Sequence, residues 1–213
     1  FMVKHIFWDW NGTLLNDASY CASIINRILS DHDLSPISYK QYRHTFGFPV
    51  KSFYKTLGLS SIGVSFEETS NDFIKYYQEG WKSCSLQEGV LETLEEISKF
   101  GVDQSIITAG KENLLGEYVN YFDLAQYFNG LVGVSHIHAS GKEARATEYA
   151  KSLDLKSGEV LMIGDRIHDH EVGIALGAEV LLVKNGHQEP ERLKKLGSRL
   201  IGSVNEVLNF LWK

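Results

Sequence analysis

The chain has 213 residues, of which 43% are hydrophobic, and a formal net charge of −6. This is enough for a well-buried core, built either as one large domain or as a core with a small insert. The acidic balance gives no basic face for nucleic acid, and no apolar stretch is long enough to span a membrane. Two cysteines, Cys21 and Cys84, cannot form a disulfide framework, so we expect a reducing, cytoplasmic location.

The first predicted strand, over 4–9, ends at a carboxylate. Its apolar run is followed by Asp-Trp-Asn-Gly-Thr-Leu at 9–14. Ligands of open α/β sheets bind outside the carboxyl ends of the strands, so Asp9 is expected at a reaction site, poised as a nucleophile. An ordinary strand followed by an Asn-Gly turn is the alternative interpretation.

The next convincing parallel strand begins only near Val102, and the patterns between are helical, over 18–31, 38–45, 50–57 and 66–81. A crossover between parallel strands needs far fewer residues, so a helical insert is expected. We therefore predict a core formed by 1–14 and 86–213 and an inserted helical domain at 15–85.

After the insert, predicted helices and strands alternate. This order is typical of an α/β protein with a doubly wound, Rossmann-like parallel sheet. The predicted strands cover 103–108, 130–134, 160–163 and 179–183, and the helices cover 89–100, 112–120, 142–153, 171–176 and 204–211.

Two later segments carry groups suited to an anion. Thr108, Ala109 and Gly110 follow an apolar strand and offer a hydroxyl and backbone N–H groups to a phosphate oxygen, although Thr108 as a helix N-cap is the simpler alternative. Lys142 begins a helix, where the macrodipole favours anions, so either an anion lies nearby or the lysine is solvated.

The strand at 160–163 leads into Gly-Asp-Arg-Ile-His-Asp. Asp165 and Asp169 are four residues apart, which brings both carboxylates to one face of a helical turn. Such close carboxylates repel unless a cation lies between them, and oxygen ligands of this kind suit Mg²⁺. Two helix-capping acids are the alternative.

Four histidines give weaker signals. His136 and His138 alternate near a strand end without a third nearby ligand, so a metal pair is a weak hypothesis. His168 and His170 flank Asp169, so an effect on the metal site is one interpretation, and exposed helix positions are the simpler one.

The four polar segments, in this order, resemble the four motifs of the haloacid dehalogenase-like (HAD) hydrolases, whose first motif is usually Asp-x-Asp-Gly-Thr-Leu. The resemblance is to a phosphoglycolate phosphatase-like group and implies a Mg²⁺-dependent phosphatase acting through an aspartyl-phosphate on Asp9. It implies that Asp9, the Asn11 carbonyl and Asp165 hold the metal, with Asp169 orienting its shell. Lys142 would bridge Asp9 and the phosphoryl group, whose oxygens Thr108, Ala109 and Gly110 would also bind.

The resemblance also implies that the helical insert is a C1 cap closing over the site. Residues 42–51 lie where such caps place a substrate loop, so Arg43, His44 and Lys51 are candidate contacts for an anionic substrate. An exposed loop with solvated bases is the alternative. The expected partner is a small phosphorylated metabolite, such as phosphoglycolate or a sugar phosphate, and the expected state is a monomer or weak dimer.

Asn11 departs from the family pattern, because the usual second Asp protonates the leaving oxygen and later activates water. An amide cannot transfer that proton. A good leaving group, a proton from a cap residue such as His44, or an engineered Asp-to-Asn change would each explain Asn11. A catalytically weak phospho-ligand sensor is the alternative function, and phosphonatase or dehalogenase chemistry are further alternatives.

Overall fold

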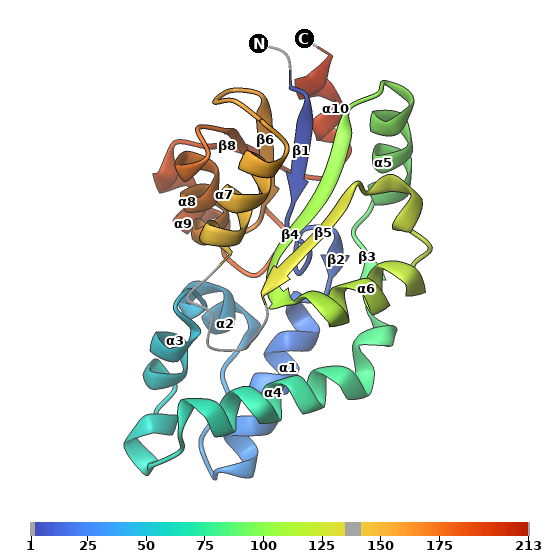
Figure 1. Ribbon diagram of the computed structural model, residues 1–213. Helices are drawn as coiled ribbons and strands as arrows, with labels where there is room; N and C mark the ends of the chain where they lie inside the picture. The colour runs from blue at the N-terminus through green and yellow to red at the C-terminus, as the bar shows by residue number, and fades with distance from the viewer. Residues whose placement is uncertain (1–2, 135–141, 213) are drawn as a thin grey trace.

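The computed structural model describes residues 3–134 and 142–212, so His136 and His138 lie outside the described residues. Its centre is a six-stranded sheet in the order β5-β4-β1-β6-β7-β8, in which every neighbouring pair is parallel (Figure 1). The strands are β1 His5–Trp8, β4 Asp103–Lys111, β5 Gly130–Val134, β6 Val160–Gly164, β7 Glu179–Val183 and β8 Arg199–Ile201. The α/β fold with a doubly wound parallel sheet is therefore confirmed.

Alternation along β1 gives each face of the sheet its own core. Ile6 and Trp8 belong to the apolar cluster that includes residues of α5, α6 and α10, whereas Phe7 belongs to the cluster formed with α7, α8 and α9. Successive side chains of a strand point to opposite faces, so β1 is buried on both sides. The helices are α5 Val90–Lys99, α6 Glu112–Tyr121, α7 Glu143–Ser152, α8 Ile167–Ala175, α9 Pro190–Leu193 and α10 Glu206–Leu211.

The helices of the insert lie beyond the carboxyl ends of the strands (Figure 1). The chain enters and leaves this group through a short antiparallel pair, in which Leu15 pairs with Leu86. We propose that this pair marks the boundary near 15 and 85 between core and insert. The elements are β2 Leu15–Asn16, α1 Ala18–Asp31, α2 Tyr39–Thr45, α3 Val50–Thr56, the 3₁₀ turn η1 Leu59–Ile62, α4 Phe66–Gly80, η2 Trp81–Ser83 and β3 Ser85–Leu86.

Local sequence explains these helices. Cys21, Ile25, Ile28 and Leu29 recur at helical spacing and are buried on one face of α1, which packs against α4. Ser38 forms a capping box at the start of α2 with the residue three positions later.

Several elements differ from the sequence-based prediction, among them β4, α8 and β8. β4 continues past Thr108, through an irregularity, to Lys111. α8 begins at Ile167, before the predicted start, and β8 was not predicted because a strand of three residues carries no readable period.

The remaining 3₁₀ turns are η3 Ala125–Tyr127 and η4 Lys194–Leu196. Within 3–134 and 142–212, no helix is long and apolar enough to cross a bilayer.

Candidate active site

Asp9 directly follows the central strand and is completely buried. Its backbone N–H donates to Ile163 at the end of β6, which fixes the residue at the carboxyl edge of the sheet. One carboxylate oxygen lies 2.5 Å from Lys142 Nζ and the other 2.5 Å from an Arg166 guanidinium nitrogen. The candidate nucleophile thus lies between two buried basic side chains, each within hydrogen-bond distance.

Lys142 reaches Asp9 from the start of α7 and is also fully buried. Its ammonium donates to the Ile107 carbonyl at 2.9 Å and lies 2.6 Å from Asp169 Oδ1. The lysine that is unfavourable at a helix N-terminus is therefore balanced by two carboxylates. The alternative of a solvated lysine is wrong.

Asp165 and Asp169 have different environments. Asp169 Oδ2 accepts the N–H groups of Asp165 and Arg166 at 2.9 and 3.0 Å, which ties down the turn before α8. Asp165 Oδ2 accepts only one backbone N–H, that of His187, at 2.5 Å, and Oδ1 contacts the Thr13 hydroxyl at 3.4 Å. Asp165 therefore retains more capacity to bind a ligand.

The pKa values of these two carboxyls move apart. Burial, with Asp9 and Asp169 nearby, raises the pKa of Asp165 to about 7. Burial alone would also raise the pKa of Asp169, but the neighbouring Lys142 and Arg166 outweigh it and lower that pKa to about 2. Asp169 is thus firmly anionic, while the charge of Asp165 lacks full compensation.

A divalent cation fits this arrangement. The carboxylate oxygens of Asp9, Asp165 and Asp169 all lie within 4.8 Å of one another, and all three residues are buried. Three carboxylates face two cations, Lys142 and Arg166, which leaves an excess of negative charge. An all-oxygen donor set of this kind suits Mg²⁺.

Glycines keep the chain close to these carboxylates. A Cβ on Gly12, which has φ +79°, would lie 2.3 Å from Asp165 Oδ2, and one on Gly186 would lie 2.1 Å from the same oxygen. A Cβ on Gly164 would lie 2.2 Å from the Asp169 side chain. At these positions a larger residue would displace the acidic cluster.

The segment from Thr108 to Gly110 lies at the end of β4 and lines a pocket of about 530 Å³. The Thr108 hydroxyl accepts the Gly110 N–H at 3.1 Å, and Thr108 lies within the strand. It is therefore not a helix N-cap. Its hydroxyl and the adjacent backbone are available to an anion in the pocket.

The Asn11 amide takes part in a buried network. Its Nδ2 donates to Asp17 Oδ2 at 2.7 Å and to the Tyr77 hydroxyl at 3.0 Å. Asp17 also accepts the Gly12 N–H at 2.9 Å. The amide of Asn11 thus supplies a hydrogen-bond donor that a carboxylate at the same position would lack.

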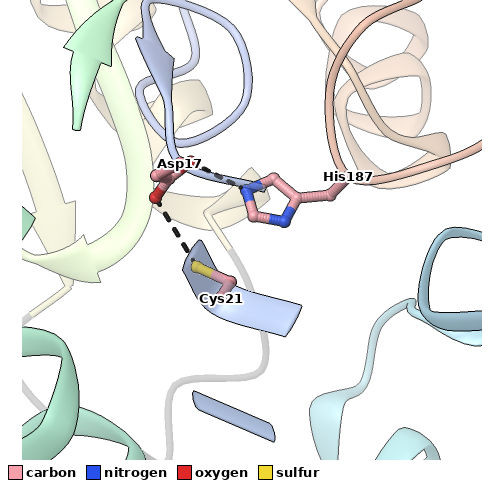
Figure 2. A group of neighbouring side chains, drawn as sticks. All are labelled: Asp17, Cys21 and His187. Carbon is pink, nitrogen blue, oxygen red and sulfur yellow. Dashed lines mark hydrogen bonds and ion pairs between the residues drawn. The ribbon is translucent and has the colours of Figure 1, made fainter. Parts of the chain in front are cut away.

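Asp17 belongs to a second buried cluster with Cys21 and His187 (Figure 2). His187 Nε2 lies 3.1 Å from Asp17 Oδ1, and the Cys21 thiol donates to Asp17 Oδ2 at 3.7 Å. Burial opposes charge on Asp17, yet His187 lowers its pKa, and Asp17 in turn raises the pKa of His187. Because hydrogen bonds already satisfy these atoms, the cluster serves to hold the turn after Asp9 against the loop after β7.

The three candidate substrate contacts of the insert lie in different surroundings. Arg43 donates to the carbonyls of Lys184, Gly186 and Gln188 and does not line the pocket. His44 is exposed and pairs with Glu189 at 2.5 Å. Of the three candidates, only Lys51 lines this pocket. Protein groups hold the Arg43 and His44 side chains away from it, so their role as substrate contacts stays a prediction.

Sequence reasoning missed two residues beside the site. Arg166, only 5% exposed, reaches Asp9 and also lies with its guanidinium carbon 5.1 Å from the Phe48 ring centroid. His168 is buried, not exposed as predicted, and its Nε2 accepts the Lys142 N–H at 3.2 Å. His170 is partly buried and bonds to the Ser198 hydroxyl. The sequence did offer one signal for Arg166, because it directly follows Asp165, a predicted metal ligand, in the segment that resembles the fourth motif.

The chain belongs to the haloacid dehalogenase-like hydrolase family, whose model matches residues 6–183. It is 26% identical over 192 residues to the N-acetylmuramic acid 6-phosphate phosphatase of Pseudomonas aeruginosa, covering 89% of this chain and 85% of that protein. It is 24% identical to the tyrosine-protein kinase PtkA of Mycobacterium tuberculosis, with 92% and 67% covered. A crystal structure titled as a predicted phosphatase from Clostridium acetobutylicum superposes with a TM-score of 0.84 at 22% identity, over 100% and 99% of the two chains. This last likeness concerns the fold.

Proposed function

We propose that this protein is a Mg²⁺-dependent phosphatase that hydrolyses small organic phosphomonoesters through Asp9. The observation that carries the proposal is the buried Asp9 carboxylate, held between Lys142 and Arg166 at the carboxyl edge of the sheet. The similarity to a sugar-phosphate phosphatase supports the same reaction class.

In the first step an Asp9 oxygen attacks phosphorus in line, and the bond between phosphorus and the ester oxygen breaks. The ester oxygen leaves with the bonding electron pair and takes a proton from water. Lys142, the Thr108 hydroxyl and backbone N–H groups beside Thr108 would hold the equatorial phosphoryl oxygens. Water then attacks the aspartyl-phosphate, which releases inorganic phosphate and restores Asp9.

Asp9, the main-chain carbonyl of Asn11 and Asp165 would hold Mg²⁺, and Asp169 would orient the surrounding groups. When bound, the metal neutralises charge that develops on the phosphoryl oxygens. The excess of carboxylates over cations supports this assignment, as does the raised pKa of Asp165.

Asn11 restricts the substrate. Its amide cannot donate a proton to the leaving oxygen, and His44 does not line the pocket that contains Asn11. Residues 15–85 would act as a cap that excludes water, with Lys51 at the pocket wall. We therefore expect faster turnover for esters that leave without protonation.

The test is release of inorganic phosphate from a panel of phosphomonoesters, with Mg²⁺ and with EDTA. The Asp9→Asn variant, which keeps the side-chain shape and removes the nucleophile, is the matched control. Mg²⁺-dependent release by the wild type, absent in the variant, supports the proposal, as does a phosphoryl mass increase on the Asp9 peptide. Saturable binding of the esters without turnover would contradict it and favour the phospho-ligand sensor.

A further inference from the structure

The pocket beside Asp9 extends from the end of β4 into the helical insert and has a volume of about 530 Å³. One end is formed by groups suited to a phosphate, among them Thr108, Gly110 and Arg166. The space is much larger than a phosphoryl group needs, and it lies in the usual range for sites that enclose a small organic molecule. The rest of the pocket should therefore hold the organic part of the ester.

The walls of that remaining space are mainly apolar. Side chains from α1, the segment between α2 and α3, α3, α4 and α6 converge on it, including Ile25, Phe46, Phe53, Phe73, Ile74 and Leu114. Aromatic rings dominate the contribution of the insert, and Phe46 and Phe53 pack edge to face at 5.2 Å. Such a wall gains free energy by removing apolar surface of a ligand from water.

The hydroxyl groups in the wall already bond to protein groups. The Tyr42 hydroxyl lies 2.7 Å from His187 Nδ1, and Tyr77 donates to Asp17 at 2.8 Å. Tyr118 accepts from Gln78 at 2.5 Å, and Tyr54 bonds to the Ser70 side chain. A sugar placed here would lose water from several hydroxyls without finding equivalent partners, which is unfavourable.

The charged side chains of the wall are cationic. Lys51, Lys111 and Arg166 line the pocket, and among the described residues no carboxylate does. This pattern accommodates the phosphate and offers nothing to an amine on the organic group. It leaves an uncharged, apolar group as the best match for the space beyond the phosphate.

We propose that the preferred substrate is a phosphomonoester with an apolar organic group, an aryl, aryl-alkyl or alkyl group of about six carbons or more that lies among the rings of the insert. This inference rests on the proposed function for the reaction and narrows its substrate class. It differs from the sequence-based expectation of phosphoglycolate or a sugar phosphate, which are small or highly polar.

The test compares n-alkyl phosphates from ethyl to hexyl with hexose 6-phosphates, all esters of primary alcohols, so leaving-group chemistry stays nearly constant. Burying each methylene is worth about 0.8 kcal/mol, so kcat/KM should rise about three- to fourfold per methylene and about 80- to 250-fold over the four methylenes from ethyl to hexyl. A flat series, or a hexose 6-phosphate that exceeds hexyl phosphate, would overturn the inference.

Ile74→Thr replaces an apolar wall residue with a smaller, polar one, and Ile62→Thr makes the same change at an exposed position outside the pocket. The first variant should lower the hexyl-to-ethyl ratio of kcat/KM at least threefold, and the second should leave that ratio unchanged. Equal losses for both esters in Ile74→Thr would contradict the proposed chain contact.

Binding of ethyl- and hexylphosphonate, measured by calorimetry, separates this inference from the proposed function, because phosphonates need no turnover. Tighter binding of hexylphosphonate supports the apolar site even if no ester is hydrolysed. Equal affinity of the two phosphonates contradicts the apolar site even if the protein is an active phosphatase.

Discussion

Replacing Asn11 with Asp tests the network around the candidate nucleophile most directly. The Asn11 amide donates to the buried Asp17 carboxylate at 2.7 Å. Asn11→Asp substitutes an oxygen for the donor and sets a second carboxylate beside the first. Loss of a hydrogen bond to a charged, buried group costs about 1.5–3 kcal/mol, so we expect a free energy of unfolding about 2 kcal/mol lower at pH 7.

The decrease in unfolding free energy caused by Asn11→Asp should be larger at pH 7 than at pH 4.5. The carboxyl introduced at position 11 should have a raised pKa in the folded state, because it would lie beside Asp17, whose own pKa is lowered. A raised folded pKa means that stability falls as pH rises above the unfolded value near 4. At pH 4.5 the protonated side chain donates to Asp17 again, so the deficit relative to wild type should shrink.

Urea unfolding of wild type, Asn11→Asp and Asn11→Ala at pH 7 and pH 4.5 measures both effects. The Ala variant loses the same donor without adding a titrating group, so its deficit relative to wild type should not shrink at low pH. An Asp variant as stable as wild type at pH 7, or a deficit independent of pH, would refute the reasoning. The same variant should hydrolyse alkyl phosphates about 10²-fold faster, with little gain for aryl phosphates, because it regains a proton donor.

Three further predictions concern other buried charges. Arg166→Met should destabilise the metal-free protein by about 3–5 kcal/mol, because the buried Asp9 carboxylate loses its ion pair with Arg166. The rise in melting temperature caused by Mg²⁺ should be larger in this variant than in wild type, and an equal rise would contradict the prediction. Asp165→Asn should weaken Mg²⁺ binding, measured by calorimetry, more than Asp169→Asn does, because backbone N–H groups already bond to the Asp169 carboxylate. A larger loss of affinity in Asp169→Asn would count against Asp165 as a metal ligand. Burial lowers the pKa of His5 to about 4, so the free energy of unfolding should fall by about 2 kcal/mol between pH 7 and pH 4.5. Urea unfolding of His5→Gln should show a pH dependence weaker by that amount. An equal pH dependence in wild type and variant would exclude His5 as the cause.

Local sequence was sufficient to place the elements that carry the site. Buried parallel strands appear as short apolar runs, and each end of such a run is marked by the first polar residue after it. Asp9, Thr108 and Asp165 could be assigned to one edge of the sheet for this reason, since the carboxyl ends of parallel strands meet there. A lysine at a helix N-terminus is unfavourable unless an anion lies nearby, so the sequence already predicted an anionic partner for Lys142.

Only the tertiary structure decided which side chains meet. Arg166 contacts Asp9 across 157 residues, and His187 contacts Asp17 across 170. These pairings depend on the path of the loops after β6 and β7 and on side-chain rotamers, which leave no period in the sequence. The same applies to Arg43, which a motif position suggested as a ligand contact but which the loop at 184–188 holds through its carbonyls. The apolar character of the pocket was also hidden, because its aromatic residues come from six separate segments and each segment alone looks like an ordinary core helix or loop.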